Sequence, residues 1–430
     1  MNLEPISISE LSKERLTSIL QRSMEDISSI YEDMRKIVQD VKTRGDASLV
    51  DSCKEYKESV SQQDLEVSPE EIEEAYNLVE PSVIGALKEA AKNIAAFHQA
   101  QLEKEMWAVE VRPGIMAGRV ARPIERAGCY VPGGRASYPS TVLMTVIPAK
   151  VAGVDMVVAT TPAMEGMKAN PATLVAAHIS GCDRIFKVGG PWGVAGLAFG
   201  TETLPKVDKI VGPGNKYVTA AKMLVYGMVD IDSPAGPSEA LILADETARA
   251  DLVAWDFLSQ AEHDPDSAAV LVTPSWELAH AVCAKVSELV KGQLRQEIIN
   301  EALQKHSQVL VAGDMDEAIA FANDYAPEHL EIITRDPFEV LPRIRHAGSI
   351  FLGPYSPVPA GDYASGTNHV LPTSRCARMF SGLSVDDFIK KPTFQYLSRD
   401  GLKSLKDVVA SLARAEGLEL HARCVEARFE

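Results

Sequence analysis

Two successive series of short apolar runs restrict what this chain can fold into more than any other feature. The first series contains GCYVPGG at 128–134, DMVVATTP at 155–162, RIFKVGG at 184–190 and DKIVGPGN at 208–215. The second contains ALILAD at 240–245, AAVLVTP at 268–274, VLVAG at 309–313 and HLEIIT at 329–334. Because helical stretches separate the runs, we expect buried parallel strands that are connected by helices.

The expected fold class is therefore α/β, with two Rossmann-like α/β units and helical N-terminal and C-terminal additions. The units are of an incomplete dinucleotide-binding type, because no strand is followed by G-x-G-x-x-G. A length of 430 residues also exceeds what one compact core usually holds. The expected domains are a helical region at 1–116 that packs on the first unit, the first unit at 117–236, the second unit at 237–381 and a helical tail at 382–430.

Helical signals fill the region before the first series. Apolar residues recur at helical spacing over 27–41, and Gly45 is a plausible stop. Ser68-Pro69-Glu70-Glu71 offers an N-cap, a first-turn proline and a capping-box glutamate. Residues 81–104 are expected to continue as helix.

Composition narrows the class of partner. A formal net charge of −17 disfavours binding to nucleic acid or to anionic membranes, so we expect a small-molecule substrate. The six cysteines are scattered and contain no C-x-x-C pair, which indicates reduced thiols. The first residues lack the pattern of a signal or transit peptide, and no apolar run approaches a membrane span. A cytoplasmic protein is the simplest expectation.

Two glycine-rich turns follow strands of the first series, Pro132-Gly133-Gly134 and Gly212-Pro213-Gly214-Asn215. Glycines there allow backbone amides to approach a ligand, and a following helix N-terminus favours an anion such as phosphate or pyrophosphate. Taken singly, each turn is better explained as a tight strand-to-helix connection without a ligand.

Three polar groups follow in the second series. Gln260 and His263 lie three residues apart near the end of an expected helix, share one face and could reach a common metal, although alone they resemble a capping or surface cluster. Glu328 and His329 follow a proline, and such a pair suits acid–base chemistry unless it simply faces solvent. Residues 361–369 are expected to form a polar loop that carries Asp362. Asp362 could bind a metal, orient a histidine or simply form an Asx-turn.

Other catalytic classes lack their motifs. The chain contains no G-x-S-x-G elbow, no G-x-x-x-x-G-K-[ST] phosphate loop and no paired-cysteine metal site. Serine hydrolase and P-loop functions are therefore excluded. Glu416 and His421 near the end would ordinarily belong to a solvated tail.

Taken together and in order, many of these fragments resemble the histidinol dehydrogenase family. The matching stretches are GCYVPGGRASYPSTVLMTVIPAKVAGV, KIVGPGNKYV, AGPSEALILADE, SQAEHD, APEHLE, HAGSIFLGPYSP, GDYASGTNHVLPT and AEGLELHAR. They extend from about residue 117 to the C-terminus, and the combination is specific to that family although no single stretch is.

The resemblance implies a complete set of site residues. It implies one Zn²⁺ per subunit, with the ligands Gln260, His263, Asp362 and His421. It implies a catalytic pair, Glu328 and His329. It implies contacts with the substrate L-histidinol from Ser238, Gln260, His263, His329, Asp362, His369, Glu416 and His421. It also implies a homodimer with an exchanged C-terminal tail.

The implied reaction is the oxidation of L-histidinol through the aldehyde to L-histidine, the last step of histidine biosynthesis, with two NAD⁺ and one water. The cofactor would contact Tyr130, Trp192 and Asn215 of the first unit. The family's usual G-G-A-Q segment here reads Gly189-Gly190-Pro191-Trp192, so an indole stands where the family has an amide.

Three alternatives stay open on the sequence. Trp192 motivates a paralogue that oxidises another small polar primary alcohol with NAD. A non-catalytic metabolite-binding protein on the same fold is a second, and a metal-assisted hydrolase is a third. The hydrolase leaves the glycine-rich turns without a role.

Overall fold

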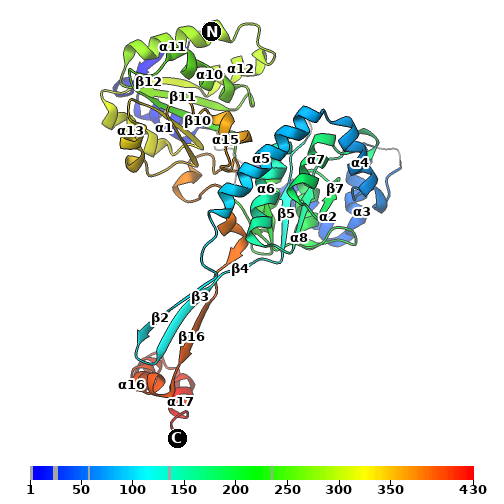
Figure 1. Ribbon diagram of the computed structural model, residues 1–430, viewed down its shortest axis with the longest axis vertical. Coiled ribbons are helices and arrows are strands. Elements are labelled where there is room, and N and C mark those ends of the chain that lie inside the picture. Colours follow the sequence, from blue (N-terminus) through cyan, green and yellow to red (C-terminus); the bar gives the residue numbers. More distant parts are fainter. Residues whose placement is uncertain (1–2, 23–27, 57–58, 134–136, 234–235) are drawn as a thin grey trace. The chain divides into compact units, whose positions relative to one another are not determined.

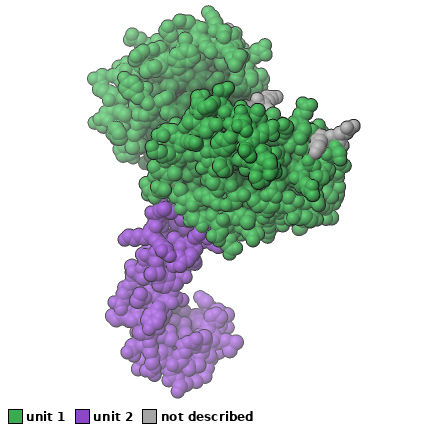
Figure 2. All heavy atoms as spheres, turned by 45° about the vertical axis from the view of Figure 1, so that its right-hand side comes forward, with its two compact units in different colours: residues 1–101, 125–388 green, residues 102–124, 389–430 purple. Residues whose placement is uncertain are grey.

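The computed structural model describes residues 3–22, 28–56, 59–133, 137–233 and 236–430. They form two compact units (Figure 2). Unit 1 comprises residues 1–101 and 125–388, and unit 2 comprises residues 102–124 and 389–430. Unit 1 contains two parallel sheets, each with helices on both faces (Figure 1).

The first sheet has the strand order β7-β6-β5-β8-β9. Its strands are β5 (Arg126–Tyr130), β6 (Met156–Thr160), β7 (Arg184–Phe186), β8 (Lys209–Val211) and β9 (Asp230–Ile231). The strand order reverses between β5 and β8, which pair in parallel. This order is the Rossmann order 3-2-1-4-5 without a sixth strand, and in such sheets ligands bind outside the carboxyl ends of the strands where the order reverses.

Helices cover both faces of the first sheet. They are α2 (Ser28–Arg44), α3 (Asp46–Ser52), α4 (Pro69–Leu78), α5 (Pro81–Gln99), α6 (Pro139–Ala152), α7 (Pro171–Ser180), α8 (Gly190–Phe199) and α9 (Lys216–Val225). α2 packs on α8 and α9, and α4 and α5 pack on α6 and α7. The early helices therefore form a further layer outside the helices that connect the strands.

The second sheet has the order β1-β12-β11-β10-β13-β14. Its strands are β1 (Pro5–Ser7), β10 (Glu239–Ala244), β11 (Ala268–Thr273), β12 (Gln308–Val311), β13 (His329–Ile333) and β14 (Ser349–Leu352). The order reverses between β10 and β13, so the second sheet repeats the topology of the first and adds β1 at one edge.

Two apolar clusters lie on the two faces of the second sheet. α10 (Ala250–Ala261), α11 (Trp276–Leu289) and α12 (Gln296–Lys305) cover one face, and α1 (Lys13–Gln21) and α13 (Met315–Tyr325) cover the other (Figure 1). α14 (Pro337–Val340) and α15 (Val358–Tyr363) follow β13 and β14. Short 3₁₀ helices in unit 1 span Ile8–Glu10, Gln62–Asp64, Glu165–Met167, Leu341–Arg343, Cys376–Arg378 and Val385–Phe388.

Unit 2 contains an antiparallel sheet of order β16-β3-β2 and a short pairing of β15 with β4. The elements are β2 (Met106–Arg112), β3 (Ile115–Val120), β4 (Arg122–Pro123), β15 (Ile389–Lys390), β16 (Thr393–Leu397), α16 (Arg399–Ala415) and α17 (Glu419–Glu426). α16 and α17 pack through small buried alanines. Among the described residues, no helix is long and apolar enough to cross a membrane.

The two expected α/β units are confirmed, and so is the capping box, in which Ser68 and Glu71 bond reciprocally. The helix expected over 81–104 is wrong at its end, because α5 stops at Gln99 and the strand β2 follows, with all of its residues exposed. The helix expected from residue 27 is α2, although Ile27 itself lies outside the described residues. The beginning and the end of the chain also contribute strands, which the helical expectation omitted.

Candidate active site

Four of the expected site residues meet at one edge of the second sheet. β10 and β13 are neighbours with Ala240 opposite His329, so both strands begin at the same edge. Ser238 precedes β10, and Glu328 precedes β13. α10 returns toward this edge before β11 begins, which brings Gln260 in its last turn. The site therefore lies at the amino ends of the strands, where the strand order reverses.

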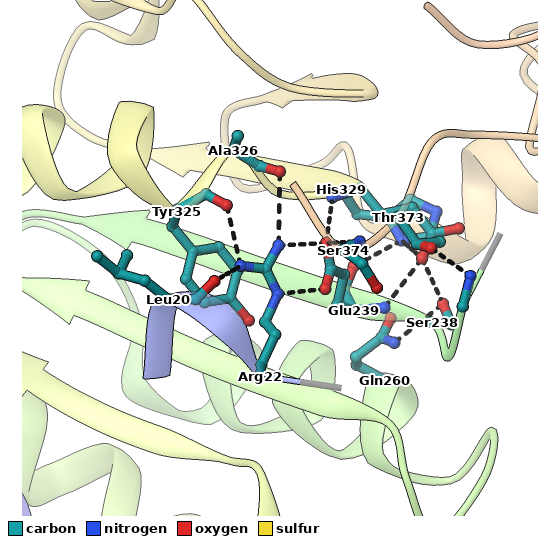
Figure 3. Close-up of polar contacts among 12 residues, drawn as sticks. Leu20, Arg22, Ser238, Glu239, Gln260, Tyr325, Ala326, His329, Thr373 and Ser374 are labelled. Carbon is teal, nitrogen blue, oxygen red and sulfur yellow. Dashed lines mark hydrogen bonds and ion pairs between the residues drawn. The ribbon is translucent and has the colours of Figure 1, made fainter. Parts of the chain in front are cut away.

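Glu328 connects these residues by hydrogen bonds. Its Oε2 accepts from Ser238 Oγ at 2.8 Å and from the Glu239 backbone N–H at 2.9 Å. Ser238 Oγ in turn accepts from Gln260 Nε2 at 3.1 Å (Figure 3). Glu328 is only 6% exposed and His329 only 3%, so the alternative of a solvent-facing pair is wrong.

His329 is oriented through one ring nitrogen and leaves the other unbonded. Its Nδ1 lies 3.1 Å from the carbonyl oxygen of Glu239. A carbonyl can only accept, so Nδ1 carries the proton and donates. Nε2 lies 3.5 Å from Asp362 Oδ1 and has no hydrogen-bond partner among the described residues. The neutral ring would thus present a basic nitrogen to a ligand.

The two groups have shifted pKa values. Burial raises the pKa of Glu328 to about 7, against the opposing effect of His329. Burial works to lower the pKa of His329, but the carboxylates of Glu328 and Asp362 overcome it and raise this pKa to about 9. Perturbed acids and bases that share a buried site are characteristic of proton-transfer chemistry.

Asp362 lies in the last turn of α15, so the expected loop placement is wrong at this position. Its backbone oxygen accepts from His369 Nδ1 at 2.8 Å, and His369 Nε2 lies 3.3 Å from Thr141 Oγ1. The neighbouring Asn368 is buried and donates to the carbonyl oxygen of Met144 at 2.7 Å. This amide anchors the segment that carries His369 to α6.

The expectation that Gln260 and His263 share one helix face is wrong. α10 ends at Ala261, because the following residues turn toward Pro265, so His263 lies beyond the helix and is exposed. Gln260 is 1% exposed, and its Oε1 has no hydrogen-bond partner in the described part of the chain. A buried, unpaired amide oxygen is suited to a cation or to an N–H donor from a ligand.

The donors in unit 1 are compatible with one divalent cation. Gln260 and Asp362 offer oxygen and His263 offers imidazole, which are ligands that Zn²⁺ accepts. Across the described ranges, no three His, Cys, Asp or Glu side chains gather closely enough to hold a metal ion. Glu416 and His421, the remaining expected contacts, belong to unit 2 and are exposed there.

The expected cofactor residues lie along the carboxyl edge of the first sheet. Tyr130 ends β5 and accepts from the Gly190 N–H at 3.0 Å through its hydroxyl. Asn215 caps α9 with its side chain, and Trp192 lies in the first turn of α8, where it packs on the core. Gly212 has φ of +120°, and an added Cβ would collide with the carbonyl oxygen of Tyr130. The turn therefore needs glycine for its backbone conformation and its packing, whether or not a ligand binds. Gly134 of the other turn lies outside the described residues.

Three residues of the site were missed by sequence reasoning. Arg22 and Glu239 form a buried ion pair that adjoins Glu328 and His329, and Glu331 is a buried carboxyl group two residues after His329. Glu331 lies within the strand β13 and Glu239 begins the otherwise apolar strand β10, so a carboxylate within or directly before a buried run was the available signal. Arg22 offers no local signal.

Comparison with known proteins identifies the family of the chain. Residues 20–429 match the family model described as histidinol dehydrogenase. A histidinol dehydrogenase of Methanothermobacter thermautotrophicus is 51% identical over 424 residues, covering 99% of each chain. One of Clostridium acetobutylicum is 47% identical over 413 residues, covering 96% of this chain and 95% of its own.

A solved structure agrees as well. The crystal structure of histidinol dehydrogenase from Elizabethkingia anophelis superposes with a TM-score of 0.94 at 39% identity, and covers 99% of this chain and 98% of its own. The chain therefore belongs to the histidinol dehydrogenase family of oxidoreductases.

Proposed function

We propose that this chain oxidises L-histidinol through the aldehyde to L-histidine, with two NAD⁺ and one water. The buried pair of Glu328 and His329 carries the proposal, because it places a carboxyl group and an imidazole with a free Nε2 at one edge of the sheet. Their shifted pKa values suit them to proton exchange near neutral to mildly alkaline pH.

His329 would take the proton of the alcohol at Nε2 during the oxidation of the carbon that bears the hydroxyl. Nδ1 keeps its proton, since it donates to the Glu239 carbonyl. Glu328 would accept a proton from the water that hydrates the aldehyde. Ser238 and the Glu239 N–H hold the Glu328 carboxylate in place for this second step. His369, held by Asp362 and Thr141, would contact the substrate imidazole.

Zinc would be held by Gln260, His263, Asp362 and His421. The unpaired Oε1 of Gln260 and the mixed oxygen and imidazole set support this assignment. Bound zinc would fix the amine and imidazole of histidinol and so raise the effective concentration of the alcohol at the cofactor. An Asp362→Ala variant should then lose histidinol binding as well as turnover. Normal binding with lost turnover would contradict the positioning role.

NAD⁺ would bind at the carboxyl edge of the first sheet, near Tyr130, Trp192 and Asn215. The reversal of strand order between β5 and β8 supports this place, since it is where α/β sheets bind nucleotides. Bound NAD⁺ would accept the hydride in each oxidation. The buried hydroxyl of Tyr130 holds the start of α8 and so fixes the turn that would approach the cofactor.

A homodimer would complete the site through the exchanged C-terminal tail, which carries Glu416 and His421. Between Glu416 and His421 in the sequence, Leu418 is 43% exposed and Leu420 is 82% exposed. Such exposed apolar side chains are suited to burial by a second copy of the chain. Mixing a Glu328→Gln variant with a His421→Asn variant should restore about a quarter of the activity, because hybrid dimers keep one intact site. No recovery after subunit exchange would refute the exchange of tails.

The direct test is a turnover assay with L-histidinol and NAD⁺, followed by NADH absorbance and by histidine formation. We expect two NADH per histidine, and loss of activity in Glu328→Gln and His329→Asn. Activity on other small polar alcohols that equals that on histidinol would favour the paralogue. Chelation should abolish turnover, and added Zn²⁺ should restore it.

A further inference from the structure

Arg22, which follows α1, lies far from the catalytic residues in the sequence and is buried beneath them. Its side chain is 3% exposed and that of its partner Glu239 is 0%. The guanidinium donates two hydrogen bonds to the Glu239 carboxylate, and further bonds to the carbonyl oxygens of Tyr325 at 2.9 Å and Leu20 at 3.1 Å. It also stacks on the Tyr325 ring, 3.5 Å from the centroid (Figure 3). Arg22 is thereby held rigidly.

Glu239 contacts both catalytic residues through three different atoms. Its side-chain Oε1 accepts from the Glu328 N–H at 3.2 Å. Its backbone N–H donates to Glu328 Oε2 at 2.9 Å, and its carbonyl oxygen accepts from His329 Nδ1 at 3.1 Å. The same Oε1 accepts from the Ser374 N–H at 3.1 Å. The position of Glu239 therefore fixes the carboxylate of Glu328 and the ring orientation of His329 together.

The ion pair is a poor device for stability alone. Desolvating two charges costs several kcal/mol, and apolar replacement of such a pair is often neutral or stabilising. The fork of Arg22 instead supplies geometry, since it joins the carboxylate at the start of β10 to the backbone just before β13. A lysine would keep the charge and lose this planar, bidentate arrangement.

We propose that the Arg22–Glu239 ion pair is a positioning device that holds Glu328 and His329 in reactive alignment. The inference rests on the catalytic roles proposed above. Neither residue touches the substrate or cofactor in this role. Their loss should lower kcat while leaving substrate affinity nearly unchanged.

The test compares Arg22→Lys with Arg343→Lys, a matched control in an exposed ion pair with Asp316. Arg22→Lys should reduce kcat for L-histidinol by about tenfold or more, because misplacement of reacting groups by about 1 Å costs up to about 100-fold. Its KM should stay within about threefold. The control should match the parent protein in both constants. A kcat of Arg22→Lys within twofold of the parent value would overturn the proposal.

A double variant separates alignment from folding. Arg22→Met combined with Glu239→Gln leaves no unpaired buried charge, so it should fold even where a single variant does not. We expect the same loss of kcat with a normal far-ultraviolet circular dichroism spectrum. A folded double variant with parental kcat would overturn the proposal, as would activity that falls only in proportion to the folded fraction.

An NMR measurement of the His329 ring tests the positioning proposal without relying on the proposed reaction. Protein labelled with ¹⁵N-histidine should show the Nδ1–H signal of His329, assigned by its loss in His329→Asn. We expect this signal to shift or broaden in Arg22→Lys and to stay unchanged in Arg343→Lys. If His329→Asn retains turnover, the proposed catalytic role of His329 is wrong. If His329→Asn is inactive but Arg22→Lys keeps the parental histidine signal and the parental kcat, only the positioning proposal is wrong.

Discussion

Replacing Glu331 by glutamine should change how the stability of the protein depends on pH. Glu331 is 1% exposed in β13, its Oε1 accepts from the Val358 N–H at 2.8 Å, and its Oε2 has no partner in the described part of the chain. Burial, reinforced by the nearby carboxylate of Asp256, raises the pKa of Glu331 to about 8 from an ordinary 4.5. The folded protein therefore binds this proton more tightly than the unfolded chain.

The sign and size of the effect follow from this pKa. The stabilisation by protonated Glu331 is complete below about pH 4.5, declines as the pH rises and is lost above about pH 8. One pKa unit corresponds to about 1.4 kcal/mol, so the loss is at most about 5 kcal/mol. Relaxation around a buried carboxylate reduces such penalties, and we expect about 2 to 3 kcal/mol. Glutamine can still accept from Val358 and does not ionise.

The assay is urea unfolding in the presence of a chelator, followed by circular dichroism at several pH values between 5 and 9. Between these limits, the unfolding free energy of the parent protein should fall by about 2 to 3 kcal/mol more than that of Glu331→Gln. The exposed Glu339→Gln serves as the matched control and should follow the parent. Parallel pH profiles for the parent and Glu331→Gln would refute the reasoning.

Three further perturbations test other parts of the structure. Phe257→Ala should reduce the unfolding free energy by about 3 to 5 kcal/mol in urea titration, since Phe257 is fully buried in α10; a loss below about 1 kcal/mol would contradict the packing. Ser68→Ala should cost about 1 kcal/mol, because it breaks the capping box with Glu71, and a neutral effect on thermal unfolding would argue against that cap. Asn368→Ala frees the segment that carries His369 and should raise the KM for histidinol about tenfold with little change in melting temperature; an unchanged KM would exclude the anchoring role.

The strands of both sheets were predictable because buried parallel strands carry their own local pattern. β10 and β11, for example, are buried at every position and follow the expected ALILAD and AAVLVTP runs within one or two residues. The three-residue β1 was not predictable, since it is a strand only by its pairing with β12. The ends of helices were less predictable than their interiors, because they also depend on contacts that the local pattern does not contain. α10, for example, ends at Ala261, before His263.

The sequence indicates members of the proposed site but not the contacts that support them. Glu328 and His329 follow a proline and are adjacent in the sequence, so their chemistry was visible before their burial was known. Arg22 could not be placed, because only the pairing of distant segments brings it to Glu239. Residue types at short spacing indicate chemistry, whereas the contacts that fix its geometry depend on the topology of the sheet.

The place of β1 at the edge of the second sheet has a consequence for biosynthesis. Pro5 lies opposite Val309, so β1 can pair only after a neighbour about 300 residues further along the chain has been synthesised. At about 5 to 20 residues per second this delay is roughly 15 to 60 seconds. The hydrogen bond from Arg22 to the carbonyl oxygen of Tyr325 is delayed in the same way. During translation the first sheet can close before the second, and a bulky fusion ahead of β1 would burden the late step in which β1 pairs with β12.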